Sequence, residues 1–434
     1  MIDHGSMESK ITPNELYDFA TKIWSYNRSL TGLGVRKTLE AIEQEVPTLK
    51  TRSFSSGLKV FDWEIPMEWN VNYAYIIDPN GNKICDFSNN NLHLIGYSES
   101  IDVDLQLSDL QDHLHSLPEQ PDAIPYITSY YEQRWGFCIS ESERQKLPQG
   151  IYKIRISTSK TIGKLDIGEI FIPGINKKEI FLSTYICHPS MANNEISGIT
   201  VSTFIAKYLA RRTNLRYSYR FVFLPETIGS ITYIYHNLKK MKKNIIAGFN
   251  LTCIGDDRNY SYLPSKNGDT LSDRAALNVL ENQYPGYKKY SWLDRGSDER
   301  QYCAPGVDLP IASLMRTKYG EYPEYHTSLD DLINVVTSKG LMGGFDLVRK
   351  VLGALEMDMI VRPKMLCEPM MSKRHLYPTL STKKLHSDVR LRMDLISYLD
   401  GRKSLLDIAN LLGKSIELIY NEVLILKEMG VVDF

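Results

Sequence analysis

Residues 178–198 read KEIFLSTYICHPSMANNEISG, a nearly uninterrupted apolar run that ends in a histidine and a polar turn. A short apolar run bounded by polar turns is typical of a strand that is buried on both faces of a sheet. We therefore expect a central strand over 178–187, followed by a helix over 195–211. His188 then leaves the sheet where the strand ends.

The alternation of strand and helix continues along the chain. Further strands are expected at 219–224, 245–254 and 309–315, and further helices at 228–242, 271–283 and 329–356. Strands that alternate with helices favour a mostly parallel sheet that is covered by helices on both faces. The sequence therefore predicts an α/β fold.

Two other segments depart from this pattern. Residues 55–160 contain short β-rich runs broken by turns, which predicts an inserted mixed α/β domain that is rich in strands. Residues 363–434 begin as a linker and continue as three short helices, which is the layout of a winged-helix domain. The α/β domain is therefore expected to be discontinuous, over 11–54 and 161–362.

The composition is that of an ordinary globular protein. The 434 residues suggest two or three domains, and the net charge of −1 gives no overall field to attract nucleic acid or an anionic membrane. Six scattered cysteines without a CxxC pair indicate reduced thiols and a cytoplasmic location.

No apolar stretch reaches roughly 18 residues, so no membrane helix is expected. No secretory signal is visible, and the opening MIDHGSMESK resembles an expression-vector remnant.

Three residues that can ligate a metal each follow a different predicted strand: His188, Glu226 and His326. Ligands bind open α/β sheets at the carboxyl ends of the strands, and a zinc site needs nitrogen and oxygen atoms that converge there. Each residue alone has a structural interpretation; His326, for example, precedes a predicted helix that Thr327 would cap. Together they predict a metal centre at the edge of the sheet.

A second polar cluster lies in the loop at 294–300, which is either an exposed ion-paired loop or the wall of a pocket. Within it, Glu299 joins Glu226 as a candidate catalytic residue. The candidate substrate-binding residues come from this loop and from two other turns: Asn194, Glu195, Asp298, Arg300 and Tyr319.

The ordered set of turns resembles the clan of zinc-dependent aminopeptidases and glutamate carboxypeptidases. In that clan a strand ends in a histidine ligand, and an Ala-Asn-Asp turn and a Ser-Gly pair follow, similar to 188–198 here. Four further segments resemble its Glu-rich turn, its Asn-Leu-Asp-Met-x-Gly segment, its Ser-Asp loop and its Tyr-His-Thr ligand: 225–230, 250–255, 297–298 and 325–327. This resemblance covers roughly 165–360 and implies zinc-dependent hydrolysis of an amide.

The whole chain more closely resembles a bacterial family of aminopeptidase-like proteins from polysaccharide-biosynthesis clusters. Members of that family carry the aminopeptidase-like domain, an inserted domain and a C-terminal winged helix. The resemblance implies the same three parts in this chain.

The sequence departs from the clan at three metal-binding positions. Asn194 stands at the position of the bridging aspartate, Thr252 at that of another aspartate ligand, and Glu226 alone remains of a Glu-Glu pair. A neutral amide brings no charge to offset the repulsion between two dications. We therefore expect one zinc ion rather than two.

The expected ligands of this ion are His188, His326 and one carboxylate. Glu226 is the first choice for that carboxylate, with Glu299 or Asp298 as stand-ins. If Glu226 does not bind the metal, it becomes the general base that deprotonates water.

Three functions remain open from the sequence. The first is metal-dependent hydrolysis of an amide in a small peptide or an amino-sugar-type substrate, and the second is a catalytically degenerate site that only binds such a molecule. The third is a winged-helix regulator with a ligand-sensing domain.

The candidate recognition helix at 415–424 carries two acids and many apolar residues, which is a poor face for phosphates. We therefore expect no nucleic acid partner, and favour docking or homo-oligomerisation for this domain.

Overall fold

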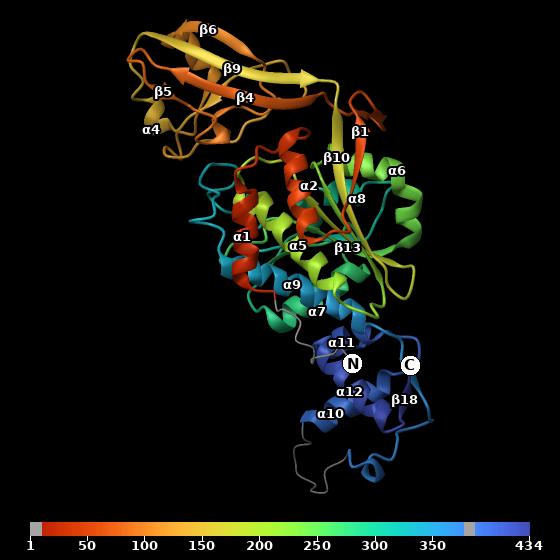
Figure 1. Cartoon of the computed structure of the whole chain (residues 1–434). Coiled ribbons are helices and arrows are strands. Elements are labelled where there is room, and N and C mark those ends of the chain that lie inside the picture. The colour runs from red at the N-terminus through yellow and green to blue at the C-terminus, as the bar shows by residue number, and fades with distance from the viewer. Residues whose placement is uncertain (1–10, 377–386) are drawn as a thin grey trace.

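The computed structural model describes residues 11–376 and 387–434. The opening decapeptide and part of the predicted linker lie outside these ranges. Figure 1 shows a strand-rich part at one end, an α/β part in the middle and a small helical part at the other end. No helix of the described residues is long and apolar enough to cross a membrane.

The central sheet has eight strands in the order β1-β10-β12-β11-β13-β16-β14-β15. Their bounds are β1 (Lys50–Ser55), β10 (Lys164–Ile172), β12 (Ser218–Leu224), β11 (Glu179–Tyr185), β13 (Ile245–Leu251), β16 (Ile311–Met315), β14 (Ser261–Leu263) and β15 (Lys288–Lys289). The four middle strands, β12 to β16, run parallel, so their carboxyl ends share one edge. The predicted α/β fold with a mostly parallel sheet is confirmed.

Helices cover both faces of this sheet. One face carries α1 (Pro13–Trp24), α2 (Leu33–Glu45), α5 (Ser197–Ala210), α7 (Leu271–Gln283) and α9 (Ser338–Met357), and the other carries α6 (Ile228–Asn244) and α8 (Glu299–Tyr302). Along β11, Ile180 and Leu182 join the first apolar cluster, whereas Phe181 joins the second. Side chains alternate across a strand, so a strand covered on both sides must be apolar throughout.

The predicted helix at 329–356 is wrong at its start. The helix α9 begins only at Ser338, and Thr327 does not cap it. Asp330 instead accepts backbone N–H groups from the turn after β11, and Asp331 accepts two from its own turn. Aspartate side chains that bind nearby backbone groups favour turns over helix, which accounts for the irregular segment.

The inserted part has an antiparallel sheet in the order β5-β4-β9-β6. Its strands are β4 (Glu68–Ile77), β5 (Lys83–Ile84), β6 (Ile101–Gln106) and β9 (Ile151–Thr161), and its shorter elements are β2 (Lys59–Val60), β3 (Trp63–Glu64), α3 (Leu107–Leu110), β7 (Leu114–His115), β8 (Phe137–Cys138) and α4 (Glu141–Arg144). The strand β9 leads almost directly into β10 of the central sheet (Figure 1). A loop of this part returns to the α/β part, where Pro125 forms a bridge with Thr327.

The C-terminal part contains α10 (Ser387–Tyr398), α11 (Leu405–Leu412) and α12 (Ile416–Glu428), with β17 (Arg362–Pro363) and β18 (Val432–Asp433) paired beside them. It is fixed to α7 by Asn278, whose side-chain amide donates to Asn410 (2.7 Å) and to the Lys414 carbonyl (2.9 Å). The side-chain oxygen of Asn278, Oδ1, accepts the Ile416 N–H at 2.9 Å. The amino end of α12 therefore lies against the α/β part.

Two glycines of α9 test how closely this helix packs on the sheet edge. A Cβ atom at Gly340 would overlap the carbonyl oxygen of Gly255, whereas one at Gly353 would meet nothing within 4 Å. We expect Gly340→Ala to lower the free energy of unfolding by about 1–3 kcal/mol through overpacking. Gly353→Ala should raise it by about 0.5–1 kcal/mol, because alanine is the better helix former. Urea unfolding measures both, and an unchanged midpoint for Gly340→Ala would refute the close packing.

Candidate metal centre

The three predicted metal ligands meet at the carboxyl edge of the sheet. The ring centres of His188 and His326 are 5.4 Å apart, with their planes at 39°. The His188 Nε2 atom is 3.9 Å from Glu226 Oε2. Two imidazoles on one tetrahedral zinc ion, with Zn–N bonds of about 2.1 Å, have ring centres roughly 5 Å apart. The separation of the two rings is therefore compatible with one shared ion.

Both imidazoles are held in the neutral form that binds metals. Burial lowers the pKa of His188 well below its ordinary value, and the nearby His326 and Arg28 add to this. Burial lowers the pKa of His326 to about 4. His326 Nε2 is buried and has no hydrogen-bond partner in the protein. Buried polar atoms are normally paired, so an unpaired imidazole nitrogen fits a metal ligand.

Two acidic side chains lie beside His188: Glu226, which is partly exposed, and Asp298, which is buried. Burial and the neighbouring Asp298 raise the pKa of Glu226, and burial also raises that of Asp298. Asp298 Oδ1 accepts hydrogen bonds from Thr227 N (2.8 Å) and Ser230 Oγ (2.7 Å), while its Oδ2 has no partner. A divalent cation beside these groups would favour their charged forms.

The turn that presents Glu226 is strained. Thr227 has a φ of 64°, which is rare for a β-branched residue and costs about 1–3 kcal/mol. The hydrogen bond from the Thr227 N–H to Asp298 holds this conformation. Asp298 therefore positions Glu226 in addition to lying beside it.

Behind the site, a buried ion pair fixes the backbone of His188. Glu195 accepts the His188 N–H with both oxygens at 2.9 Å, and Arg28 Nε donates to Glu195 and to the His188 carbonyl at 3.1 Å each. Both charged side chains are fully buried. Glu195, predicted as a substrate contact, is therefore engaged in positioning a ligand.

Cys187, His188 and Glu195 offer an alternative metal group, because one donor atom of each lies within 4.8 Å of the others. The charge of Glu195 is already offset by Arg28, which would repel a cation. Burial raises the pKa of the Cys187 thiol well above its ordinary value, so this sulfur is a neutral thiol. Donor chemistry therefore favours the Nε2 side of His188, with Glu226 and His326.

The side chain of Asn194, which lies on a π-helical turn (Ala192–Ile196) before α5, contacts neutral groups, whereas its backbone N–H donates to Asp330 Oδ2 at 3.0 Å. Its amide donates to the Tyr185 hydroxyl (2.8 Å), which lies 2.6 Å from Thr252 Oγ1. The carbonyl of Asn194 accepts from both hydroxyl groups. The two hydroxyl groups bring no negative charge to hold a second cation, and both oxygens of Asp330 already accept backbone N–H groups.

The loop residues Glu299 and Tyr319 are tied into the protein. The Glu299 carboxylate has five donors: the backbone N–H groups of Gly296 and Ser297, the Tyr319 hydroxyl, the Asn250 amide and the Ser313 hydroxyl. Because these donors occupy both oxygens, the hydrogen bonding favours a loop-holding role over catalysis. Arg300 is exposed beside the strained turn and donates to Thr227 Oγ1 at 3.1 Å.

The inserted part supplies a residue that sequence reasoning missed. The ring centre of Tyr126 is 5.2 Å from that of His188 and 5.3 Å from that of His326. Its N–H donates to the His326 carbonyl (3.0 Å), and its hydroxyl lies 2.7 Å from that of Tyr130. The only signal in the sequence was an aromatic run between prolines, which does not say where the loop returns. Arg28 was missed because the sequence does not show that it pairs with Glu195.

Comparisons with known proteins agree with this fold. The family described as "Domain of unknown function (DUF4910)" matches residues 17–358, and a winged helix-turn-helix family matches 359–433. A Clostridium acetobutylicum protein, provisionally named a polysaccharide biosynthesis protein with an aminopeptidase-like domain, is 39% identical over 405 residues, 92% of each chain.

Two solved structures extend the comparison. A crystal structure from Clostridium acetobutylicum, provisionally named a peptidase, has a TM-score of 0.91 and 37% identity over 97% of this chain and 96% of that one. A zinc aminopeptidase from Bacillus subtilis shares the fold with a TM-score of 0.57, at 13% identity over 80% of this chain and 95% of its own. The chain therefore belongs to the DUF4910 family, with an aminopeptidase-like fold, and it carries a C-terminal winged helix-turn-helix.

Proposed function

We propose that this chain is a zinc-dependent, aminopeptidase-like hydrolase that cleaves an amide in a small peptide or an amino-sugar-type substrate. The observation that carries the proposal is the convergence of two neutral imidazoles and a partly exposed carboxylate at one edge of the sheet. The provisional names of the Clostridium relatives and the fold of the Bacillus enzyme support it.

His188, His326 and Glu226 would hold one zinc ion. Zinc at such a position supplies Lewis acidity, which polarises a substrate carbonyl and acidifies water. The neutral network around Asn194 supports one ion rather than two. The unpaired cysteines fit a reducing, cytoplasmic setting.

The chain's own groups would bind the substrate and move the proton. Asp298 Oδ2, which has no partner in the protein, accepts a proton from the attacking water and passes it to the leaving amine. Arg300 at the rim offers its remaining N–H groups to a substrate carboxylate. Tyr126, whose hydroxyl is hydrogen-bonded to Tyr130, covers the imidazoles from the inserted part and excludes water from the reacting atoms.

Asp298→Asn tests the proton-transfer step. We expect the rate of amide hydrolysis to fall by at least about 100-fold, because an amide cannot accept the proton. Zinc content should stay near that of the wild type, since the carbonyl oxygen of the new side chain can still accept the Thr227 N–H. The assay uses aminoacyl anilides, dipeptides and N-acylated amino sugars, with exposed Asp294→Asn from the same loop as the control. Wild-type turnover in Asp298→Asn would remove Asp298 from the reaction.

The neutral network around Asn194 favours a second candidate function, in which the site binds an amide-containing molecule without cleaving it. The zinc-loaded protein would then bind members of the same panel and hydrolyse none.

We do not propose a DNA-binding winged-helix regulator, because recognition helices read DNA with their amino-terminal residues. Here the first residue of α12 is hydrogen-bonded to Asn278 of the α/β part.

A further inference from the structure

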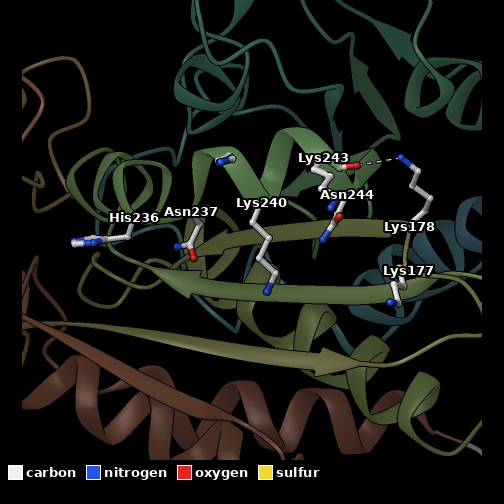
Figure 2. Close-up of a pocket in the computed structure, with 8 residues that line it drawn as sticks. Lys177, Lys178, His236, Asn237, Lys240, Lys243 and Asn244 are labelled. Carbon is white, nitrogen blue, oxygen red and sulfur yellow. Dashed lines mark hydrogen bonds between the residues drawn. The ribbon is translucent and has the colours of Figure 1, made fainter.

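A lysine-rich hollow lies on the outer surface of α6. Figure 2 shows side chains from this helix and from the loop before β11 around it. The hollow has a volume of about 740 Å³. We call it the lysine hollow, and its lining residues are Lys177, Lys178, His236, Asn237, Lys239, Lys240, Lys243 and Asn244.

The positive charge of the hollow is largely uncompensated. Lys178 donates to the Lys243 carbonyl at 3.0 Å, but Lys177, Lys239 and Lys240 make no ion pair within the described part of the chain. Lysines in the last turn of a helix complement its dipole, and this accounts for Lys243. The other three lie outside that turn or on another segment, so the dipole does not explain them.

The acid that is hydrogen-bonded to Asn244 of the hollow is already paired. Glu179, which is buried, binds Arg220 at 2.6 Å and accepts the Asn244 amide at 3.2 Å. It therefore offers little negative charge to the lysines above it. An anion that entered the hollow would meet lysine ammonium groups and the Asn237 amide.

One end of the hollow is aromatic. Figure 2 shows His236 at one end, Lys177 and Lys178 at the other, and Lys240 between them. The His236 ring stacks on Phe54 at 4.8 Å and contacts Tyr235 at 5.1 Å. Tyr235 in turn contacts Phe61 at 5.2 Å, and these two side chains are 46% and 58% exposed. Exposed rings beside a cationic surface suit a ligand that carries both phosphates and a planar base.

We propose that the lysine hollow binds a nucleoside diphosphate, with the phosphates on the lysines and the base against Tyr235. From His236 to Lys243 the helix rises by roughly 10 Å, a distance that such a molecule covers in an extended form. The concave shape and the volume suit a small molecule better than a duplex or a flat membrane.

This site is separate from the metal centre. Glu226 precedes the amino end of α6, and Lys240 lies twelve residues beyond Ile228, roughly 18 Å along the helix. Lys177 and Lys178 precede β11, at the end of the sheet opposite His188. The bound molecule would therefore act as an effector or an anchor and would not enter the reaction.

The test is calorimetric titration of the full chain with UDP, ADP, pyrophosphate and uridine. We expect saturable binding of a diphosphate nucleotide, weaker binding of pyrophosphate and the weakest binding of uridine. The double variant Lys239→Glu/Lys240→Glu should bind the nucleotide at least about tenfold more weakly, because it reverses two charges. Exposed Lys288→Glu/Lys289→Glu on β15 is the matched control and should bind like the wild type.

A second variant distinguishes the contribution of the aromatic end of the hollow from that of its lysines. Tyr235→Ala should weaken nucleotide binding and leave pyrophosphate binding unchanged, and thermal unfolding checks that each variant folds. Failure of both nucleotides to bind, or equal binding by the Lys239/Lys240 variant, overturns the proposal. Binding of single-stranded DNA or phosphatidylglycerol vesicles through these lysines, without nucleotide binding, would overturn it in favour of a polymer or a membrane.

Discussion

His326→Asn is expected to lower the affinity for zinc by more than about 100-fold. Loss of a residue that only orients a ligand already costs about 10–100-fold, and loss of the ligand itself should cost more. Asparagine suits the position because His326 has a φ of 57°, a conformation that asparagine tolerates. Competition with a chromogenic chelator measures the affinity.

The chain offers a closely matched control for this variant. His375 is exposed and has a φ of 56°, so His375→Asn makes the same change in the same backbone conformation. Its zinc affinity should equal that of the wild type. If both variants bound zinc alike, His326 would not be a ligand.

Arg28→Met is expected to lower the free energy of unfolding by about 3–5 kcal/mol, because it leaves the buried Glu195 without its cation. The pair is fully buried, so solvent cannot replace the lost partner. Burial raises the pKa of Glu195 to about 7 even with Arg28 in place, so part of the cost can be relieved by protonation. Removing Arg28 raises the pKa of Glu195 further, so urea unfolding is measured at pH 8, where protonation relieves less of the cost than at neutral pH.

Arg349→Met is the control for this second variant, because Arg349 pairs with Asp346 on the surface at 3.2 Å. An exposed pair contributes about 0–1 kcal/mol, so the control should unfold close to the wild type. Arg28→Met should also weaken zinc binding, because Arg28 and Glu195 fix the backbone of His188. Equal unfolding midpoints for the two variants would show that the buried ion pair of Arg28 and Glu195 does not stabilise the fold.

Local patterns in the sequence were sufficient for the main elements of the fold. The apolar run before His188 forms β11, buried on both faces, as expected. The start of the predicted helix at 329–356 is wrong because Asp330 binds backbone groups of a distant turn. A periodic pattern carries no information about such a partner.

The candidate site was predictable where a metal-binding residue follows a strand directly. His188 and Glu226 come just after β11 and β12, so the parallel sheet alone brings them to one edge. The use of each carboxylate was not predictable, because it depends on donors far away in the chain. Glu299 has three such donors, from Asn250, Ser313 and Tyr319, whereas Asp298 keeps one oxygen free. Tyr126 reaches the site only through the folding of the inserted part.

The central claim is that His188, His326 and Glu226 hold one divalent ion at the edge of the sheet. Anomalous diffraction at the zinc absorption edge, from crystals grown with zinc, locates such an ion directly. We expect one anomalous peak per chain at these ligands, with both imidazoles bonded through Nε2. A peak between Cys187 and Glu195, a second peak beside Asn194, or no peak near the two imidazoles would contradict it.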